Sequence, residues 1–302
     1  MVTHDPDRLL DVLVRFHSMS RFDELDRCLF SLVAQPYRPA RINLLTQRFT
    51  GEETDELNRR LAPMLSLADD LTLNIINFAE ADPVDARTRL LNLGLANTDG
   101  RYIAFLDYDD VIYPEAYISL IRRMRPTDCA IAFARVVVKR RDVFEDALMV
   151  TTKEELFVGA GLVDLFRDNF CPIHSFVIDR RRVPPDQLHF SEVLSKLEDY
   201  DFLLRLTAIC PSDFGFVANV AGDYYFKNDG SNTIQTSESD ASKDPEDWAQ
   251  AREYIAALKE KTIISDRVQR QLALPELLGG LTIGRLVSAH QRWRDQQREI
   301  AK

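Results

Sequence analysis

The segment "RYIAFLDYDDVIYPE", residues 101–115, joins an apolar strand pattern to a cluster of acidic residues. An apolar run ends there in Asp107, Asp109 and Asp110, which places three carboxylates within four residues. Like charges at this spacing repel one another, so water, a helix N-terminus or a metal ion must offset them. Side chains two apart on a strand point the same way, so we expect Asp107 and Asp109 to converge while Asp110 faces elsewhere.

The segments around this stretch alternate between strand and helix patterns. Short apolar runs predict strands at residues 11–16, 41–46, 71–78 and 101–107. Helical spacing predicts helices at 21–35, 52–68 and 82–97, the last starting with Asp82 before Pro83, and a further helix with Pro114 near its first turn. This alternation indicates βαβ units and a largely parallel sheet. Ligands of such sheets bind beyond the carboxyl ends of the strands, where the acidic cluster lies.

The rhythm changes after about residue 125. A mixed half follows, with strands expected at 129–144, 174–183 and 214–228 and helices at 161–169 and 195–208. Residues 229–247 are rich in Ser, Asp, Asn and Thr, which is typical of a polar linker or long loop. Two or three helices are expected in 248–302, with Trp248, Ala251, Ile255 and Leu258 on one face.

Composition bounds the class of protein. The chain has 302 residues and a net charge of −10, which argues against a general nucleic-acid binder. Four widely spaced cysteines without a zinc-like pattern are expected to be free thiols. The N-terminus lacks signal-peptide features, and no segment approaches 18 consecutive apolar residues. These features favour a cytoplasmic protein without a membrane-spanning helix.

The residues around the acidic cluster carry a family resemblance. The segment "RTRLLNLGLANTDGRYIAFLDYDDVIYPEAYISLI" resembles the part of family 2 inverting glycosyltransferases that runs from the nucleotide-contacting Arg and Asn into the DxD motif. "VLVRFHSMSRFDELDRCLFSLVAQPYRPARINLL" resembles the opening strand, helix and turn of that family. "NFCPIHSFVIDRRRV" and "FSEVLSKLEDYDFLLRL" resemble its acceptor-side strand and its ED motif.

The resemblance covers roughly residues 11–235 and implies an α/β fold of the GT-A type, a Rossmann-like mixed sheet with helices on both faces. It implies a GT-A domain at 1–235, with a nucleotide-binding half at about 1–125 and an acceptor half at about 126–235. Residues 236–302 would be the polar linker and a C-terminal helical appendage. The appendage is expected to pack on the core, on a second subunit in a homodimer, or on the inner face of the membrane.

The resemblance also implies roles for the acidic residues. Asp107 would contact the nucleotide ribose, and Asp109 would ligate the Mn²⁺ or Mg²⁺ that bridges the diphosphate, with Asp107 as a second metal candidate. Asp110 would orient the cluster or contact the donor sugar on the acceptor side. Asp199 of the ED motif would be the general base that takes the acceptor hydroxyl's proton, with Glu198 as an acceptor contact.

Further candidates complete this implied site. The nucleotide side would include Arg15, His17, Gln47, Arg87, Arg89 and Asn92, and the acceptor side His174. Each has an alternative interpretation without function. The aspartates of the cluster could cap the following helix, the arginines could lie on a solvated helix face, and the histidines could be hydrogen-bonded core residues. The ED carboxylates could simply favour a helix N-terminus.

The sequence departs from the family at the end of the second strand. The family carries an acidic pair there, one of whose members reads the nucleobase, but this chain has Thr46 and Gln47.

The leading hypothesis is a metal-dependent inverting glycosyltransferase of polysaccharide biosynthesis. Its donor would be a UDP-sugar, with GDP- or TDP-sugars as alternatives, and its acceptor a glycan or lipid-linked glycan. The alternative is a non-catalytic GT-A domain. A sugar-1-phosphate nucleotidyltransferase is disfavoured because "RFHSMSRF" contains no glycine.

Overall fold

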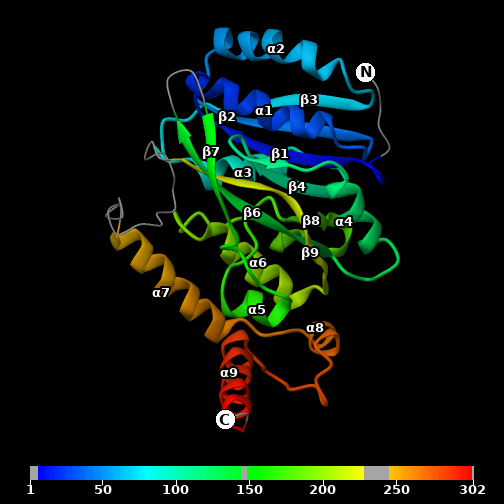
Figure 1. The fold of residues 1–302 in the computed structure, drawn as a ribbon, viewed down its shortest axis with the longest axis vertical. Coiled ribbons are helices and arrows are strands. Elements are labelled where there is room, and N and C mark those ends of the chain that lie inside the picture. Colours follow the sequence, from blue (N-terminus) through cyan, green and yellow to red (C-terminus); the bar gives the residue numbers. More distant parts are fainter. Residues whose placement is uncertain (1–5, 144–147, 228–244, 301–302) are drawn as a thin grey trace.

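The computed structural model describes residues 6–143, 148–227 and 245–300. The strands are β1 (Leu10–Phe16), β2 (Ala40–Gln47), β3 (Leu71–Phe78), β4 (Tyr102–Asp107), β5 (Val111–Ile112), β6 (Ile131–Val143), β7 (Leu148–Glu154), β8 (Phe176–Asp179) and β9 (Ser212–Lys227). In these residues they form one sheet in the order β3-β2-β1-β4-β8-β6-β9-β5, and β7 pairs with β6. Figure 1 shows this sheet crossing the molecule.

The first half of the sheet is parallel, as the alternation of strand and helix predicts. β1 pairs in parallel with β2 and β4, and β2 with β3. The register places Arg15 opposite Asp107, so both side chains leave the sheet near its carboxyl edge. Beyond β4 the sheet becomes mixed, since β8 runs antiparallel to β4 and to β6. The expectation of a mixed α/β sheet is therefore confirmed.

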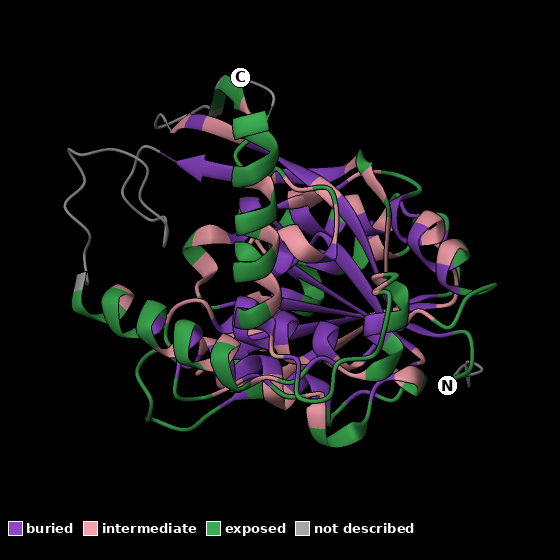
Figure 2. Cartoon of the chain, turned by 90° about the horizontal axis from the view of Figure 1, so that it is seen from below, coloured by how far each residue is buried: buried purple, intermediate pink, exposed green. Residues whose placement is uncertain are grey.

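Helices cover both faces of the sheet. They are α1 (Phe22–Val33), α2 (Gly51–Leu65), α3 (Arg87–Ala96), α4 (Ala116–Met124), α5 (Leu162–Arg167), α6 (Glu198–Ile209), α7 (Pro245–Lys261), α8 (Asp266–Gln271) and α9 (Ile283–Ile300). Alternate strand side chains point to opposite faces, so the core divides into two clusters. One packs α1, α2 and α4 on Val12, Val14 and Ala104, and the other packs α3 and α6 on Leu13 and Phe105. Figure 2 shows the strands buried between these layers.

The C-terminal helices lie outside the sheet and are not detached from the core. Ile255 of α7, Val268 of α8 and Ile283 of α9 belong to the same buried cluster as α6 and the sheet. α7 contacts α6 and α9, and α9 contacts α5. The face predicted for the first of these helices is confirmed, since Ala251 and Ile255 are 3% and 4% exposed. Most of α9 is nevertheless exposed (Figure 2).

The helix expected from residue 82 starts five residues later, so that part of the prediction is wrong. α3 begins at Arg87, and the preceding residues 79–86 form a loop. The guanidinium of Arg48 donates hydrogen bonds to the carbonyl oxygens of Glu80, Ala81, Pro83 and Val84 at 2.5–3.2 Å. These carbonyls thus find partners outside a helix, which stabilises the loop.

Three other expectations have clear outcomes. The strand predicted at 174–183 is shorter, because β8 ends at Asp179 and a 3-10 turn follows at Arg180–Arg182. All four cysteines are free, as predicted. Within the described ranges, none of the helices combines the length and hydropathy needed to cross a bilayer. Most of the polar segment predicted at 229–247 lies outside the described residues.

Candidate active site

A cavity of about 570 Å³ opens at the carboxyl ends of β1, β2 and β4. We call it the strand-end cavity. Three of its walls are the end of β1, the turn after β4 and the loop before α3. Its lining includes seven of the residues singled out from the sequence, namely Arg15, His17, Gln47, Arg87, Asp107, Asp109 and Asp110. The fold therefore brings most of the predicted site together.

Asp107 is held by Arg15 across the two neighbouring strands. The Nε and Nη2 atoms of Arg15 each donate a 2.8 Å hydrogen bond to the Asp107 carboxylate. Nη1 of the same guanidinium lies 3.4 Å from Oε1 of Glu198 at the start of α6. Burial would lower the pKa of Arg15, but the charges of Asp107 and Glu198 outweigh it and raise that pKa. Arg15 is therefore a fixed cation between two carboxylates.

Asp109 lies beyond the end of the strand. β4 ends at Asp107, and the chain turns so that the Asp110 amide donates a 3.0 Å hydrogen bond to the Asp107 carbonyl. The alternation expected for a strand does not apply past this point. Asp109 Oδ2 pairs with Lys227 Nζ at 2.9 Å, and the same ammonium pairs with Glu24 at 3.0 Å. Lys227 is thus a second cation shared by two carboxylates.

Asp110 faces the interior. The sequence predicted only that it would point away from the direction of Asp107 and Asp109. Its Oδ1 accepts a 2.8 Å hydrogen bond from the Tyr225 amide, and Oδ2 lies 3.4 Å from Nδ1 of His174. Burial, followed by the charges of Asp109 and Asp107, raises the pKa of Asp110 well above its usual range. Burial lowers the pKa of His174 to about 4. His174 is therefore neutral near pH 7 and does not offset the charge of the cluster.

A second, smaller space continues from the strand-end cavity. This inner pocket measures about 120 Å³ and shares Arg15, Arg87, Asp107 and Tyr224 with its neighbour. Its remaining lining is Phe157, Asn169, Pro172, Ile173, Lys196, Leu197, Glu198, Asp199 and Trp248. The DxD and ED carboxylates, which are far apart in sequence, therefore face one continuous space.

Asp199 is held in place at the inner pocket. Its Oδ1 accepts a 2.7 Å hydrogen bond from the Tyr200 amide, and Oδ2 accepts one of 3.3 Å from the Asn169 amide group. Burial, together with the negative charge of Glu198, raises the pKa of Asp199 to about 7. A carboxyl group with this pKa can both accept and release a proton near neutral pH.

Three predicted residues line neither of these spaces: His174, which lies behind Asp110, and Arg89 and Asn92 of α3. Arg89 pairs with Glu192 at 3.1 Å and with Glu80 at 3.4 Å on the surface of α3. Asn92 clamps the backbone of Phe190, donating a 3.0 Å bond to its carbonyl and accepting one of 2.8 Å from its amide. For Arg89 the alternative of a helix-surface ion pair thus describes its contacts, while Arg87 lines both spaces.

The structure also tests the alternative of capping. α4 begins after Glu115, with no side-chain hydrogen bond at its cap, so none of the three aspartates caps it. Glu198 and Asp199 do lie in the first turn of α6, as the helix-dipole alternative required. Their contacts with Arg15 and Asn169 go beyond that effect.

Several lining residues were not predicted from the sequence. Tyr224 and Arg48 line the strand-end cavity, and Lys227 pairs with Asp109 behind the lining; all three come from segments that carry no pattern linking them to the acidic cluster. Trp248 comes from α7, after residues that the structure does not describe. Asn169 had a signal, because it opens the quoted segment "NFCPIHSF".

The residues present fit a divalent cation held jointly with a phosphorylated ligand. Within the described residues no group of three His, Cys, Asp or Glu side chains is arranged to hold a metal by itself. Mg²⁺ at phosphate sites usually needs only one or two carboxylates besides phosphate oxygens and water. Four carboxylates of the cluster (Asp107, Glu198, Asp109, Glu24) form ion pairs with three cations (Arg15, Lys227, Arg21), which leaves one negative charge if all are ionised.

Comparison with known proteins places this geometry in context. Residues 18–183 match the family model described as glycosyl transferase family 2. The structure of S. aureus TarS 1–349 is similar with a TM-score of 0.55 and 12% identity, over 87% of this chain and 68% of that one. The same protein in complex with UDP-GlcNAc gives 0.53 and 14%, over 87% and 70%.

A third structure adds a different nucleotide sugar. The mannosyltransferase PcManGT from Pyrobaculum calidifontis, in complex with GDP-Man and Mn²⁺, gives a TM-score of 0.51 and 12% identity, over 97% and 82% of the two chains. No curated protein sequence matches the chain. At these identities the structural likeness shows a shared GT-A fold, and the family match ends before Asp199.

Proposed function

The chain belongs to glycosyl transferase family 2, and from that membership we propose that it transfers a sugar from a nucleotide-diphosphate sugar to a glycan or lipid-linked acceptor, with inversion. The observation that carries the proposal is the position of Asp199. A carboxyl group with a pKa of about 7 lies in a pocket continuous with the strand-end cavity. A general base and a nucleotide-sized cavity are the two parts that the reaction needs.

The strand-end cavity would hold the donor. Asp107 would accept hydrogen bonds from the ribose hydroxyls, and Arg87 would face the diphosphate. Gln47 donates its amide hydrogen to the Val84 carbonyl at 2.7 Å, which leaves its carbonyl oxygen for a nucleobase donor group. The complexes of TarS with UDP-GlcNAc and of PcManGT with GDP-Man support a donor of this class. We favour a UDP-sugar, with GDP- and TDP-sugars as alternatives.

Asp109 would hold Mn²⁺ or Mg²⁺ against the donor diphosphate. The cation, when bound, would neutralise the charge that grows on the departing diphosphate. Support comes from the uncompensated negative charge of the cluster and from the Mn²⁺ in the PcManGT complex. Lys227 fixes Oδ2 of Asp109, so the other oxygen, Oδ1, would be the ligand.

Asp199 would carry out the proton transfer in a single displacement. Its carboxylate takes the proton of the acceptor hydroxyl as that oxygen attacks the anomeric carbon from the face opposite the diphosphate. The bond from the anomeric carbon to the diphosphate oxygen breaks, and its electron pair leaves with the nucleotide. Asn169 would orient the carboxylate, and Glu198 would contact the acceptor while Arg15 holds it beside Asp107.

The test is the Asp199→Asn variant. The amide keeps the size of the side chain and cannot take the proton, so turnover should fall about 10²- to 10⁴-fold. Affinity for the nucleotide should stay within about twofold of wild type, because Asp199 does not line the strand-end cavity. The measurement is sugar release from a panel of UDP-, GDP- and TDP-sugars with water or acceptor.

Asp186→Asn is the matched control, since Asp186 is an exposed aspartate outside both spaces. Wild-type turnover in Asp199→Asn together with a loss in Glu198→Gln would move the base to Glu198. If the wild-type chain binds a nucleotide sugar and never releases the sugar, the non-catalytic alternative is correct.

A further inference from the structure

The structure contains a third cavity that the proposed reaction does not use. This outer cavity measures about 480 Å³. It lies among α5, α6, α7 and α9, and its lining is Asp168, Leu197, Tyr200, Trp248, Arg252, Ile255, Ala256, Lys259, Glu260, Gly284, Val287 and Ser288. Leu197 and Trp248 also line the inner pocket, so the two spaces meet at these side chains.

The inner pocket is too small to hold an acceptor alone. Sites for small molecules usually measure about 300–1,000 Å³, and the inner pocket has about 120 Å³. A molecule that brings a hydroxyl group to Asp199 must therefore extend beyond it. One direction leads into the strand-end cavity, which the donor occupies. The other leads past Leu197 and Trp248 into the outer cavity.

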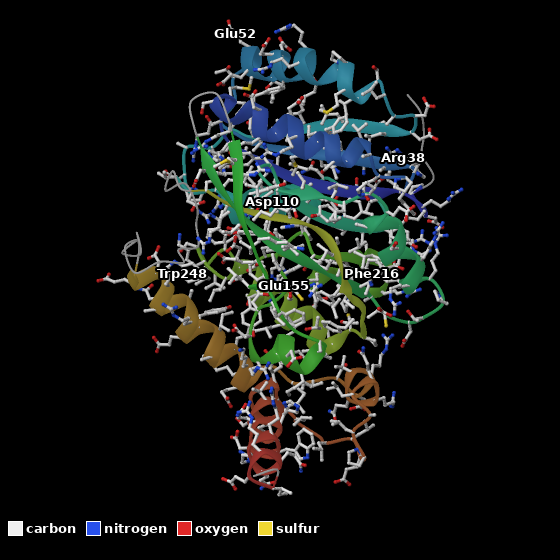
Figure 3. All side chains as sticks on the ribbon, viewed as in Figure 1. Arg38, Glu52, Asp110, Glu155, Phe216 and Trp248 are labelled. Atoms are coloured by element: carbon white, nitrogen blue, oxygen red, sulfur yellow. The ribbon has the colours of Figure 1, made fainter. Side chains whose placement is uncertain are left out.

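Trp248 is held at this junction by the packing of α7. Ala251 and Ile255, one turn and two turns further along the helix, are buried in the core. Asp247 accepts a 3.3 Å hydrogen bond from Ser195, three residues before the ED motif. At the other end of α7, Lys259 donates a 2.9 Å bond to the Arg167 carbonyl of α5. Figure 3 labels Trp248 on α7, the helix beside the sheet. The packing of α7 therefore fixes the position of the Trp248 indole relative to Asp199.

The chemistry of the outer cavity suits a sugar better than an acyl chain. Aromatic and aliphatic groups, including Trp248 and Ile255, provide apolar surface for the C–H face of a pyranose ring. The charged groups of Arg252, Lys259 and Glu260 lie beside them and can bond to hydroxyl groups. An acyl chain would cover these charges without bonding to them, which costs free energy.

We propose that the acceptor is an oligosaccharide whose terminal sugar enters the inner pocket and whose preceding sugar stacks on Trp248 and lies in the outer cavity. This inference rests on the proposed function and specifies its acceptor. Trp248 is then a specificity residue that measures acceptor length. A single sugar fills the inner pocket and gains nothing from the outer cavity.

Intrinsic fluorescence can test the proposal, because the chain has two tryptophans. Trp293 of α9 is 55% exposed and outside the cavity lining, so Trp293→Phe leaves Trp248 as the reporter. The probes are gluco-, galacto-, manno- and N-acetylglucosaminyl saccharides of one to four units. At least one series should shift the emission saturably, and affinity should rise about tenfold or more from one unit to three. Titration calorimetry, which needs no fluorescent reporter, should show that Trp248→Ala removes that dependence on length.

Three results would overturn the proposal. The first is that no saccharide series changes the fluorescence, and the second is equal affinity for saccharides of one and three units. The third is an affinity for alkyl glycosides that rises with the length of the alkyl chain while the sugar stays the same. Donor hydrolysis by the wild-type chain is also measured without acceptor. This measurement distinguishes failure of the proposed acceptor site from failure of the proposed function. A chain that hydrolyses donor and ignores saccharide length refutes the acceptor site alone. A chain that binds saccharides by length and never hydrolyses donor refutes the catalytic function alone.

Discussion

Arg15 and Lys227 show how the strand ends tolerate several carboxylates in a small volume. Each cation is shared by one residue of the DxD motif and one carboxylate from a helix, Glu198 or Glu24. Sharing brings the aspartates together without neutralising them fully. In the proposed function, the remaining negative charge would attract a divalent cation, which a diphosphate could share.

We predict that nucleotide-diphosphate binding depends on a divalent cation through Asp109. Asp109→Asn removes one negative ligand and should lower affinity for UDP or GDP in Mn²⁺ about tenfold or more, because charge-assisted contacts contribute about 1.5–3 kcal/mol. The measurement is titration calorimetry in Mn²⁺ and in EDTA. Asp186→Asn is again the control. Equal affinity of the wild-type chain under the two conditions would refute this prediction.

The pKa of Asp199 predicts the pH dependence of turnover. The base must be ionised, so kcat/KM should fall about tenfold per pH unit below pH 7 and level off above it. A rate profile from pH 5 to 9 with saturating Mn²⁺ measures this limb. The residual activity of Asp199→Asn should lack it. A wild-type limb centred near pH 4 would show that the site does not raise this pKa.

The raised pKa of Asp199 also makes the folded chain less stable as the pH rises. The carboxyl ionises near pH 3.9 in the unfolded chain and near 7 in the folded one, so the folded state binds the extra proton. Folding free energy is therefore lost as pH rises from about 4 to about 7. Asp199→Asn should consequently unfold at a higher temperature than wild type at pH 8 and show no gain at pH 4. A gain in stability that accompanies a loss of activity is typical of strained catalytic sites.

For single residues, the sequence predicted that the acidic cluster lies at a strand end, where it is found, and did not predict that Arg89 and Asn92 lie away from both spaces. The strand pattern fixes Asp107 at the end of β4, whereas the turn that follows sets the directions of Asp109 and Asp110. Arg89 and Asn92 depend instead on the rotation of a helix, which the late start of α3 changes. Their partners, Glu192 and Phe190, come from a segment with no helical or strand pattern.

The loop before α3 forms part of the wall of the strand-end cavity. It contributes Val84 and Asp85 to the lining, and Arg48 holds it through four backbone carbonyls. Arg48 itself adopts a positive φ of 57° at the end of β2. A helix was predicted here because Asp82 before Pro83 is typical of a helix start, and a carbonyl-binding arginine leaves no periodic signal in the sequence.

We predict that Arg48→Met weakens donor binding by releasing this loop. Loss of four hydrogen bonds should lower affinity for UDP or GDP about tenfold, because part of the cavity wall must be ordered again on binding. Arg38→Met is a matched control. Arg38 also donates to four carbonyls, those of Val33, Gln35, Tyr37 and Asp69, and lies away from the cavity (Figure 3). Arg38→Met should lose about as much stability as Arg48→Met without losing affinity. Equal losses of affinity in the two variants would refute the role of the loop.

At the scale of the whole molecule, the three C-terminal helices complete the core instead of adding to a finished domain. The sequence predicted helices and an apolar face there, and the structure confirms both. It could not predict that Trp248 would reach the pocket of Asp199. The polar residues that precede α7 contain no apolar period, so nothing in them fixes where the helix packs.

We predict that a chain ending at residue 244 does not fold stably. It would lose Ile255, Ile264, Val268 and Ile283 from the buried cluster, each worth about 1.5–3 kcal/mol. The sum is comparable to the total stability of about 5–15 kcal/mol of a typical protein. A chain ending at Arg294 removes only exposed residues of α9 and should melt within about 2 °C of wild type by calorimetry. A cooperative transition in the shorter chain would contradict the prediction.

The shared guanidinium of Arg15 has a consequence for the order of events. A donor that satisfies Asp107 changes how strongly Arg15 is drawn to Glu198, and thereby alters the field at the acceptor's entry point. Free energies around a binding cycle must sum to zero, so the acceptor acts on donor affinity by the same factor. In the proposed reaction, the affinities of the two substrates would therefore be coupled through this one side chain.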